Sequence, residues 1–119
     1  MSRDDATLLD MLKAARLAME FKGKIGKKAF LKDAKTQSAI LHQLLILGEA
    51  VKRLSENFRA KHPKISWTKI AGMRDKLIHE YDAADLDEVW KTVTKDIPPL
   101  FAFLEPLVPR DKEYFPNQG

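Results

Sequence analysis

The spacing of apolar residues between positions 35 and 58 constrains the fold of this chain more than any other feature of its sequence. Steps of four and three residues alternate along one seam, which consists of Ile40, Leu44, Leu47, Val51, Leu54 and Phe58. This spacing lines one face of an α-helix and is typical of helices that pack against other helices. A flanking row widens the apolar stripe and consists of Leu41, Leu45 and Gly48. The sequence therefore predicts a long helix over 35–58 that is covered on two sides.

Two arrangements would cover both sides of this helix. It lies either between two copies of the chain or at the centre of a monomeric bundle, and we predict the homodimer. Gly48 destabilises a helix interior by about 1 kcal/mol relative to alanine. Its presence within the stripe indicates that another backbone comes close to the helix at this point.

Helical periodicity continues on both sides of this segment, and no useful stretch alternates with the two-residue period of a strand. A first helix is predicted over 4–22, where two glycines at positions 23 and 26 end it. A short helical piece over 27–32 is expected to pack Phe30 and Leu31 against the core.

Capping signals divide the second half of the chain. Ser66 is expected to be the N-cap of a third helix, and Asp85 with Glu88 forms a capping box that opens a fourth. The pair Pro98–Pro99 is expected to kink or restart the chain before a last helix over 100–107.

The length of 119 residues fits one compact domain. We predict an all-α, four- to five-helix up-down bundle over residues 1–108, followed by a tail at 109–119. The chain has no cysteine, which excludes disulfides and thiolate chemistry and suits a reducing cytoplasm. The start, Met1–Asp5, is too polar for a secretory signal, and the longest apolar run, Leu44–Leu47, is far shorter than the roughly 20 residues of a membrane span. We expect a soluble, cytoplasmic protein.

Arg74, His79 and Tyr81 place a guanidinium, an imidazole and a phenol within one short segment. Arginine binds phosphate oxygens through a planar fork of N–H donors, and histidine takes or releases a proton near neutral pH. This is the smallest set of groups that could cleave a phosphodiester without a metal ion, and we hypothesise that His79 acts as general acid or base while Arg74 stabilises the developing charge. In the alternative interpretation, Arg74 forms a surface ion pair and His79 is a cation at the end of a helix.

The spacing of Arg74 and His79 points their side chains about 140° apart on a straight helix. One phosphate can contact both only if Arg74 curls around, if the helix breaks near Ile78, or if two copies meet at a twofold axis. We predict the third arrangement, a composite site in a dimer cleft. Asp75 lies one turn before His79 and is expected to hydrogen-bond and orient the imidazole.

Other polar residues carry weaker signals. Glu49 is expected to pair with Arg53 one turn later, or else to reach into a polar cleft. The three histidines lie far apart and cysteine is absent, so we predict no metal site. Trp67 and Trp90 are expected to be core residues.

A lysine-rich stretch between positions 22 and 35 stands out in a chain whose formal charge is +4. A mildly basic balance permits contact with nucleic acid without requiring it. Lys24, Lys27 and Lys28 are therefore candidate RNA contacts, and the alternative is a solvated surface.

The Arg74-x4-His79-x-Tyr81 motif is accompanied by four further markers in a fixed order: Leu47-Gly48-Glu49-Ala50, Pro63-x-Ile65-x-Trp67, Val89-Trp90 and Ile97-Pro98. Together they resemble the HepT-type branch of the HEPN superfamily, over nearly the whole of residues 8–108. The resemblance implies an all-α homodimer in which Arg/His motifs face each other across a cleft and act as a ribonuclease without metal or cofactor.

The resemblance also implies a biological role. Such proteins usually serve as the toxin of a two-gene, type VII-like toxin–antitoxin module that acts on RNA such as tRNA or mRNA. The antitoxin is a minimal nucleotidyltransferase that transfers AMP to the tyrosine of the motif, here Tyr81. The adduct would add negative charge and bulk where RNA must enter. Asp75, Tyr81 and Glu49 would support the site.

The chain departs from the family pattern at Asp75, where asparagine is frequent. An extra carboxylate beside the phosphate site is expected to repel RNA. Two other functions stay open: a non-catalytic substrate-binding subunit of a two-component nucleotidyltransferase, and a dimeric adaptor without chemistry. Cleavage of cellular RNA after expression would separate the nuclease from both.

Overall fold

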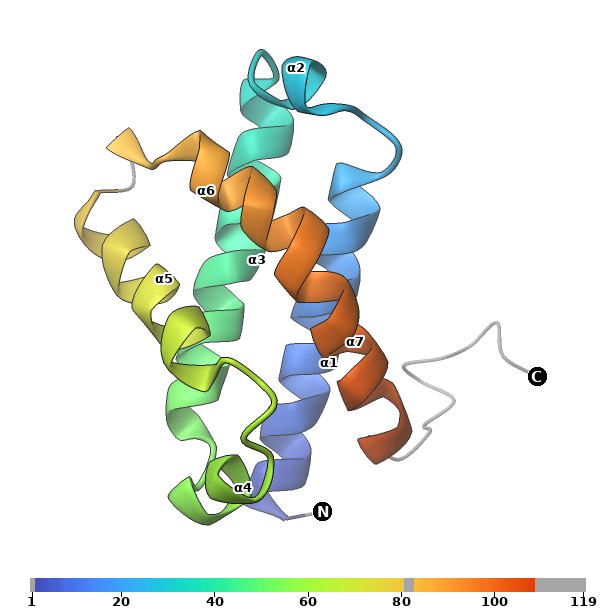
Figure 1. Cartoon of the computed structure of the whole chain (residues 1–119), viewed down its shortest axis with the longest axis vertical. Helices are drawn as coiled ribbons and strands as arrows, with labels where there is room; N and C mark the ends of the chain where they lie inside the picture. The colour runs from blue at the N-terminus through green and yellow to red at the C-terminus, as the bar shows by residue number, and fades with distance from the viewer. Residues whose placement is uncertain (1, 81–82, 109–119) are drawn as a thin grey trace.

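The computed structural model describes residues 2–80 and 83–108, and this part of the chain is helical throughout, with no β-strand. Three helices, α1 (Arg3–Lys22), α3 (Ala34–Arg53) and α5 (Trp67–His79), form its frame. Helix α3 lies between the other two (Figure 1). None of the helices in this part of the chain is long and apolar enough to cross a membrane. The predicted all-α class is confirmed, and the predicted tail, 109–119, lies outside the described residues.

Helix α1 begins and ends where local chemistry requires it. The hydroxyl of Ser2 accepts a hydrogen bond from the N–H of Asp5, and the Asp5 carboxylate accepts one from the N–H of Ser2, which completes a capping box. Gly23 ends the helix with a φ of 53° and donates its N–H to the carbonyl oxygen of Met19. The predicted end of the first helix is therefore confirmed.

A short helix, α2 (Lys27–Phe30), leads into α3. Phe30 is fully buried, as predicted, but Leu31 is 40% exposed, so its predicted packing is wrong. Asp33 then caps α3, because its carboxylate accepts hydrogen bonds from the N–H and the hydroxyl of Thr36 at 3.1 and 2.6 Å.

The apolar seam of α3 is buried within the chain itself. Its buried members are Ile40, Leu44, Leu47, Val51 and, just past the helix end, Leu54. Helix α1 covers one side of α3 and α5 covers another (Figure 1). Two neighbours in one chain therefore account for the width of the stripe, and the homodimer stays a prediction that needs a different argument.

The predicted continuous helix over 35–58 is wrong, because α3 ends at Arg53. Leu54 adopts an extended backbone, and Ser55 caps a separate helix, α4 (Glu56–Lys61), by accepting a hydrogen bond from the N–H of Phe58. The side chain of Asp4 holds this corner, accepting hydrogen bonds from the N–H and hydroxyl of Ser55 at 3.0 and 2.7 Å. A residue at the start of α1 thus stabilises the break.

The C-terminal part forms one helical path across the bundle, from α6 (Leu86–Lys91) through the π-helix η2 (Thr92–Asp96) to α7 (Ile97–Leu104), which packs on α1 (Figure 1). Asp85 caps α6, as predicted, because its carboxylate accepts hydrogen bonds from the N–H groups of Asp87 and Glu88, but the return bond from the N–H of Asp85 to Glu88 that completes a capping box is not formed. Pro98–Pro99 lie in the first turn of α7. Their missing N–H groups are tolerated there, because the first N–H groups of a helix have no partner within it. A short 3-10 turn, η3 (Glu105–Leu107), follows.

Candidate functional site

The absence of a side chain at Gly48 positions Arg74. A Cβ atom added at Gly48 would lie 2.1 Å from Cβ of Arg74, 2.9 Å from its Cγ and 3.2 Å from the carbonyl oxygen of Ile70. The stem of Arg74 on α5 therefore crosses directly over the backbone of α3. This confirms the close approach predicted at Gly48 and shows that α5 makes it.

The guanidinium of Arg74 is held by two carboxylates. Its Nε donates to Oε1 of Glu49 at 2.9 Å, its Nη2 donates to the same oxygen, and its Nη1 donates to Oδ1 of Asp75 at 3.0 Å. These contacts raise the pKa of Arg74, with the hydrogen bonds that it donates to Glu49 contributing most, so the group stays charged. A guanidinium has five N–H donors, and these bonds use three. Two donors remain for a ligand on a side chain that is 23% exposed.

The partner predicted for Glu49 is wrong. Glu49 faces α5 and bonds to Arg74, whereas Arg53 reaches α1, where its Nη2 lies 3.3 Å from Oδ2 of Asp10. Glu49 is instead held at the edge of the α3–α5 interface by its pair with Arg74.

Asp75 does not orient His79 in the structure. Its Oδ1 accepts hydrogen bonds from Nζ of Lys52 at 2.5 Å and from Arg74. The hydrogen bond from Lys52, followed by that from Arg74, lowers the pKa of Asp75 below its ordinary value. The prediction of an Asp75–His79 pair is therefore wrong, because the carboxylate turns toward α3.

Within the described part of the chain, Lys52 joins the charge network although the sequence interpretation did not point to it. A signal for it existed, because Lys52 lies one helical turn after Gly48 and is therefore near the same edge of α3. Once Gly48 marks a close approach, the polar residues beside it are expected to border the contact.

His79 is the last residue of α5, and its side chain is exposed. The helix continues unbroken from Trp67 to His79, which excludes the break near Ile78 as a way to join the motif. Arg74 is tied to Glu49 and Asp75, so it does not curl toward His79 either. Within one chain the two groups diverge. Tyr81, the predicted AMP acceptor, lies outside the described residues.

The three candidate RNA-binding lysines are at the surface. Lys24 and Lys28 are exposed, and Nζ of Lys27 lies 2.9 Å from Oδ1 of Asp87 at the start of α6. Both side chains of this ion pair are more than half exposed, and such a pair is too weak to withdraw Lys27 from a ligand.

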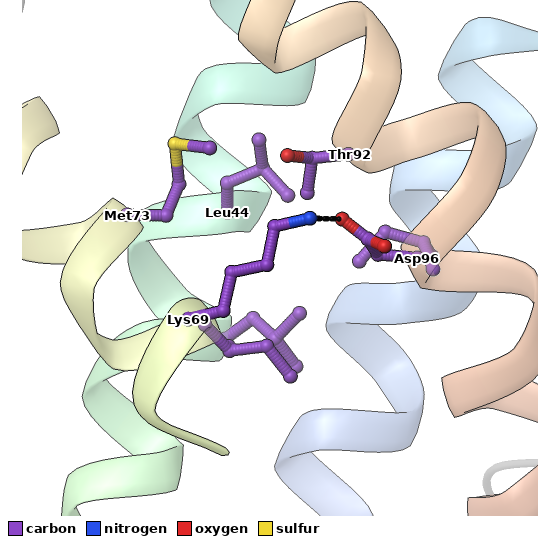
Figure 2. A pocket seen from close by; sticks show the side chains of 8 residues that line it. Leu44, Lys69, Met73, Thr92 and Asp96 are labelled. Carbon is purple, nitrogen blue, oxygen red and sulfur yellow. Dashed lines mark ion pairs between the residues drawn. The ribbon is translucent and has the colours of Figure 1, made fainter. Parts of the chain in front are cut away.

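Two recesses beside α5 are lined by residues outside this charge network. Figure 2 shows the first, where Lys69 reaches across an apolar floor to form an ion pair with Asp96 at 2.7 Å, beside Thr92 of η2. The second has a volume of about 250 Å³ and a partly acidic lining that includes Glu80 and Glu88. Neither Arg74 nor His79 lines either of these recesses.

The sequence of the chain matches a known protein family. A family model described as "Ribonuclease HepT-like" matches residues 11–107, a span that contains Glu49, Lys52, Arg74, Asp75 and His79. The chain belongs to the HepT-like ribonuclease family. The predicted resemblance to HepT is thereby confirmed.

Several relatives align with the chain over most of their length. A protein of Thermococcus cleftensis named "Probable ribonuclease HepT" is 45% identical over 100 residues, which are 84% of this chain and 91% of the relative. A protein of Caldanaerobacter subterraneus subsp. tengcongensis named "Putative RNase" is 45% identical over 83 residues, 70% of this chain and 74% of that one. Another "Putative RNase", from Methanocaldococcus jannaschii, is 39% identical over 93 residues, 78% and 77% of the two chains. No solved structure matches the chain significantly.

Proposed function

We propose that this HepT-like chain is a metal-independent endoribonuclease in which Arg74 and His79 are the catalytic residues. One observation carries the proposal: Arg74 is held charged at the edge of α3 and α5 with two N–H donors unused, on the helix that ends in exposed His79. The relatives whose names describe ribonucleases support the choice of RNA as substrate.

The chemistry follows from the two groups. The 2′-hydroxyl oxygen of RNA attacks the adjacent phosphorus, and His79 takes the hydroxyl proton. The bond from phosphorus to the 5′-oxygen breaks, and that oxygen takes up the proton that His79 accepted from the 2′-hydroxyl. The products are a 2′,3′-cyclic phosphate and a free 5′-hydroxyl. Arg74 binds the non-bridging oxygens and stabilises their developing charge, so the positive charge needed at the phosphate is a fixed part of the protein.

The divergence of the two catalytic groups supports a composite site formed by two copies. On one unbroken α5 they point about 140° apart, so a phosphate that touches both needs Arg74 from one protomer and His79 from its partner. Ile78, which lies between them along α5, is 48% exposed, an apolar side chain that a second copy would cover.

Mixing two inactive variants tests the composite site. A dimer of one Arg74→Ala and one His79→Ala protomer retains a complete Arg/His pair only if each site takes its two groups from different subunits. We expect mixed dimers to recover about half of the wild-type activity. Dimers that assemble but stay inactive would show that each protomer needs its own pair.

The wider role follows from the family resemblance. We propose that the protein is the toxin of a type VII-like toxin–antitoxin module, acting in the cytoplasm on tRNA or mRNA through the helical domain at residues 1–108. A cognate nucleotidyltransferase would silence it by adding AMP to Tyr81, since a phosphoryl group two residues from His79 repels the RNA backbone.

Induction experiments test this role. Expression should arrest growth and fragment total RNA, and Arg74→Ala or His79→Ala should abolish both effects. Arg53→Ala, which removes an arginine bound to Asp10 instead, is the matched control. Co-expression with the neighbouring gene product should restore growth and add the mass of AMP to Tyr81. Intact RNA during growth arrest would favour the non-catalytic binding subunit over the nuclease.

A further inference from the structure

Lys52 occupies a position in the site that none of the roles described so far explains. We propose that Lys52 is a second phosphate-binding cation, and that Asp75 holds it beside Arg74 for this purpose. The inference rests on the proposed ribonuclease function and deepens it, because it assigns an additional residue to recognition of the RNA backbone.

Geometry places the two cations on one anion. Nζ of Lys52 and Nη1 of Arg74 bond to the same oxygen, Oδ1 of Asp75, at 2.5 and 3.0 Å. The two nitrogens are therefore no farther apart than the sum of these distances, and one phosphate group or two neighbouring ones can span them. The Lys52 side chain is 41% exposed and uses one of its three N–H donors on Asp75, so two remain for solvent or a ligand.

The charges of the network explain why a lysine is needed here. Glu49 and Asp75 each accept from Arg74 and together offset more than its single positive charge. Without another cation the site would carry a net charge of −1, which opposes binding of a phosphodiester. Lys52 brings the four-residue network to zero and supplies a point charge that can turn from the carboxylate to an incoming phosphate.

The role of Lys52 can be tested by measuring the affinity for RNA of a variant that cannot cleave it. With His79→Ala as background, Lys52→Gln should weaken binding of a single-stranded oligoribonucleotide about fivefold at low salt, the upper end for an exposed charge pair. It should also reduce the slope of log affinity against log salt by about 0.7, the value for one lost phosphate contact on a single strand. Lys52→Arg should preserve both quantities.

Arg53→Gln is the matched control. It removes the same charge at the adjacent position of α3, from a side chain that bonds to Asp10 on α1. It should leave the salt slope unchanged. Thermal unfolding of each variant identifies any loss of binding that arises from a loss of structure.

A double variant distinguishes a phosphate contact from a merely structural ion pair. Lys52→Gln leaves Asp75 as an excess negative charge, so Lys52→Gln/Asp75→Asn should recover part of the lost affinity but not the lost salt slope. Suppose that Lys52→Gln leaves the slope of log affinity against log salt unchanged, while the wild-type protein cleaves RNA. That result would overturn the role of Lys52 and leave the ribonuclease proposal standing. A wild-type protein that neither binds nor cleaves RNA would overturn both.

Discussion

Replacing Gly48 by alanine tests the contact that positions Arg74. The added Cβ would lie 2.1 Å from Cβ of Arg74 and 3.2 Å from the carbonyl oxygen of Ile70. Neither of these atoms is the far end of a flexible side chain, so the clash cannot be relieved by a new rotamer. Helices α3 and α5 must move apart, and the guanidinium of Arg74 moves away from Glu49.

The expected size of the effect comes from two opposing terms. Overpacking of a tight contact costs about 1–3 kcal/mol, and this one belongs to the upper part of that range. Alanine recovers about 1 kcal/mol of helix propensity at the same position. The net loss in the free energy of unfolding is therefore about 1–2 kcal/mol. Unfolding entropy is roughly 2.1 cal/mol/K per residue, so for 119 residues the Tm should fall by about 4–8 °C.

Gly72→Ala is the matched control within the same pair of helices. Gly72 lies in α5, and a Cβ added there meets nothing within 4 Å. Only the propensity gain of about 1 kcal/mol applies, so the Tm should rise by about 4 °C. Circular dichroism melts of both variants measure the two shifts. A Gly48→Ala protein as stable as Gly72→Ala would refute the close approach of α5 to α3.

Three further predictions concern other contacts. Asp33→Ala should lower the free energy of unfolding by about 1 kcal/mol in denaturant titrations, because α3 loses its N-cap, while Asp33→Ser should retain most of the stability. The hydrogen bonds from the hydroxyl and N–H of Thr36 lower the pKa of Asp33 below its ordinary 3.8, so its stabilising contribution is present above that value and lost as the pH falls through the lowered pKa. Asp33→Ser should therefore flatten the acid limb of a stability-against-pH curve below about pH 4, and an unchanged limb would contradict the assignment. Glu49→Ala should lower the free energy of unfolding by no more than about 1 kcal/mol, since the carboxylate is half exposed. It should nevertheless reduce kcat for RNA cleavage with a smaller change in KM, because Arg74 loses its orientation. A change in KM alone would argue against this positioning role.

The sequence predicted which residues form the candidate site, but it did not predict which of them bond to one another. Arg74, His79, Asp75 and Glu49 could be chosen from local spacing and family resemblance. The partners assumed for the two carboxylates were neighbours one turn away on the same helix, because a sequence displays only that kind of proximity. In the structure both carboxylates contact residues more than 20 positions away, Glu49 with Arg74 and Asp75 with Lys52.

The sequence by itself determined the helical class, the end of α1 at Gly23, the buried seam of α3 and the close approach at Gly48. Each of these depends on interactions within a few residues or on a periodic pattern, and such information is local. Only the tertiary structure decided that α3 stops at Arg53, since Asp4 of another helix holds Ser55 at the corner. The tertiary structure also decided that Arg74 and Asp75 of α5 form one network with Lys52 of α3. Their electrostatic attraction becomes strong only after packing has brought the two helices together.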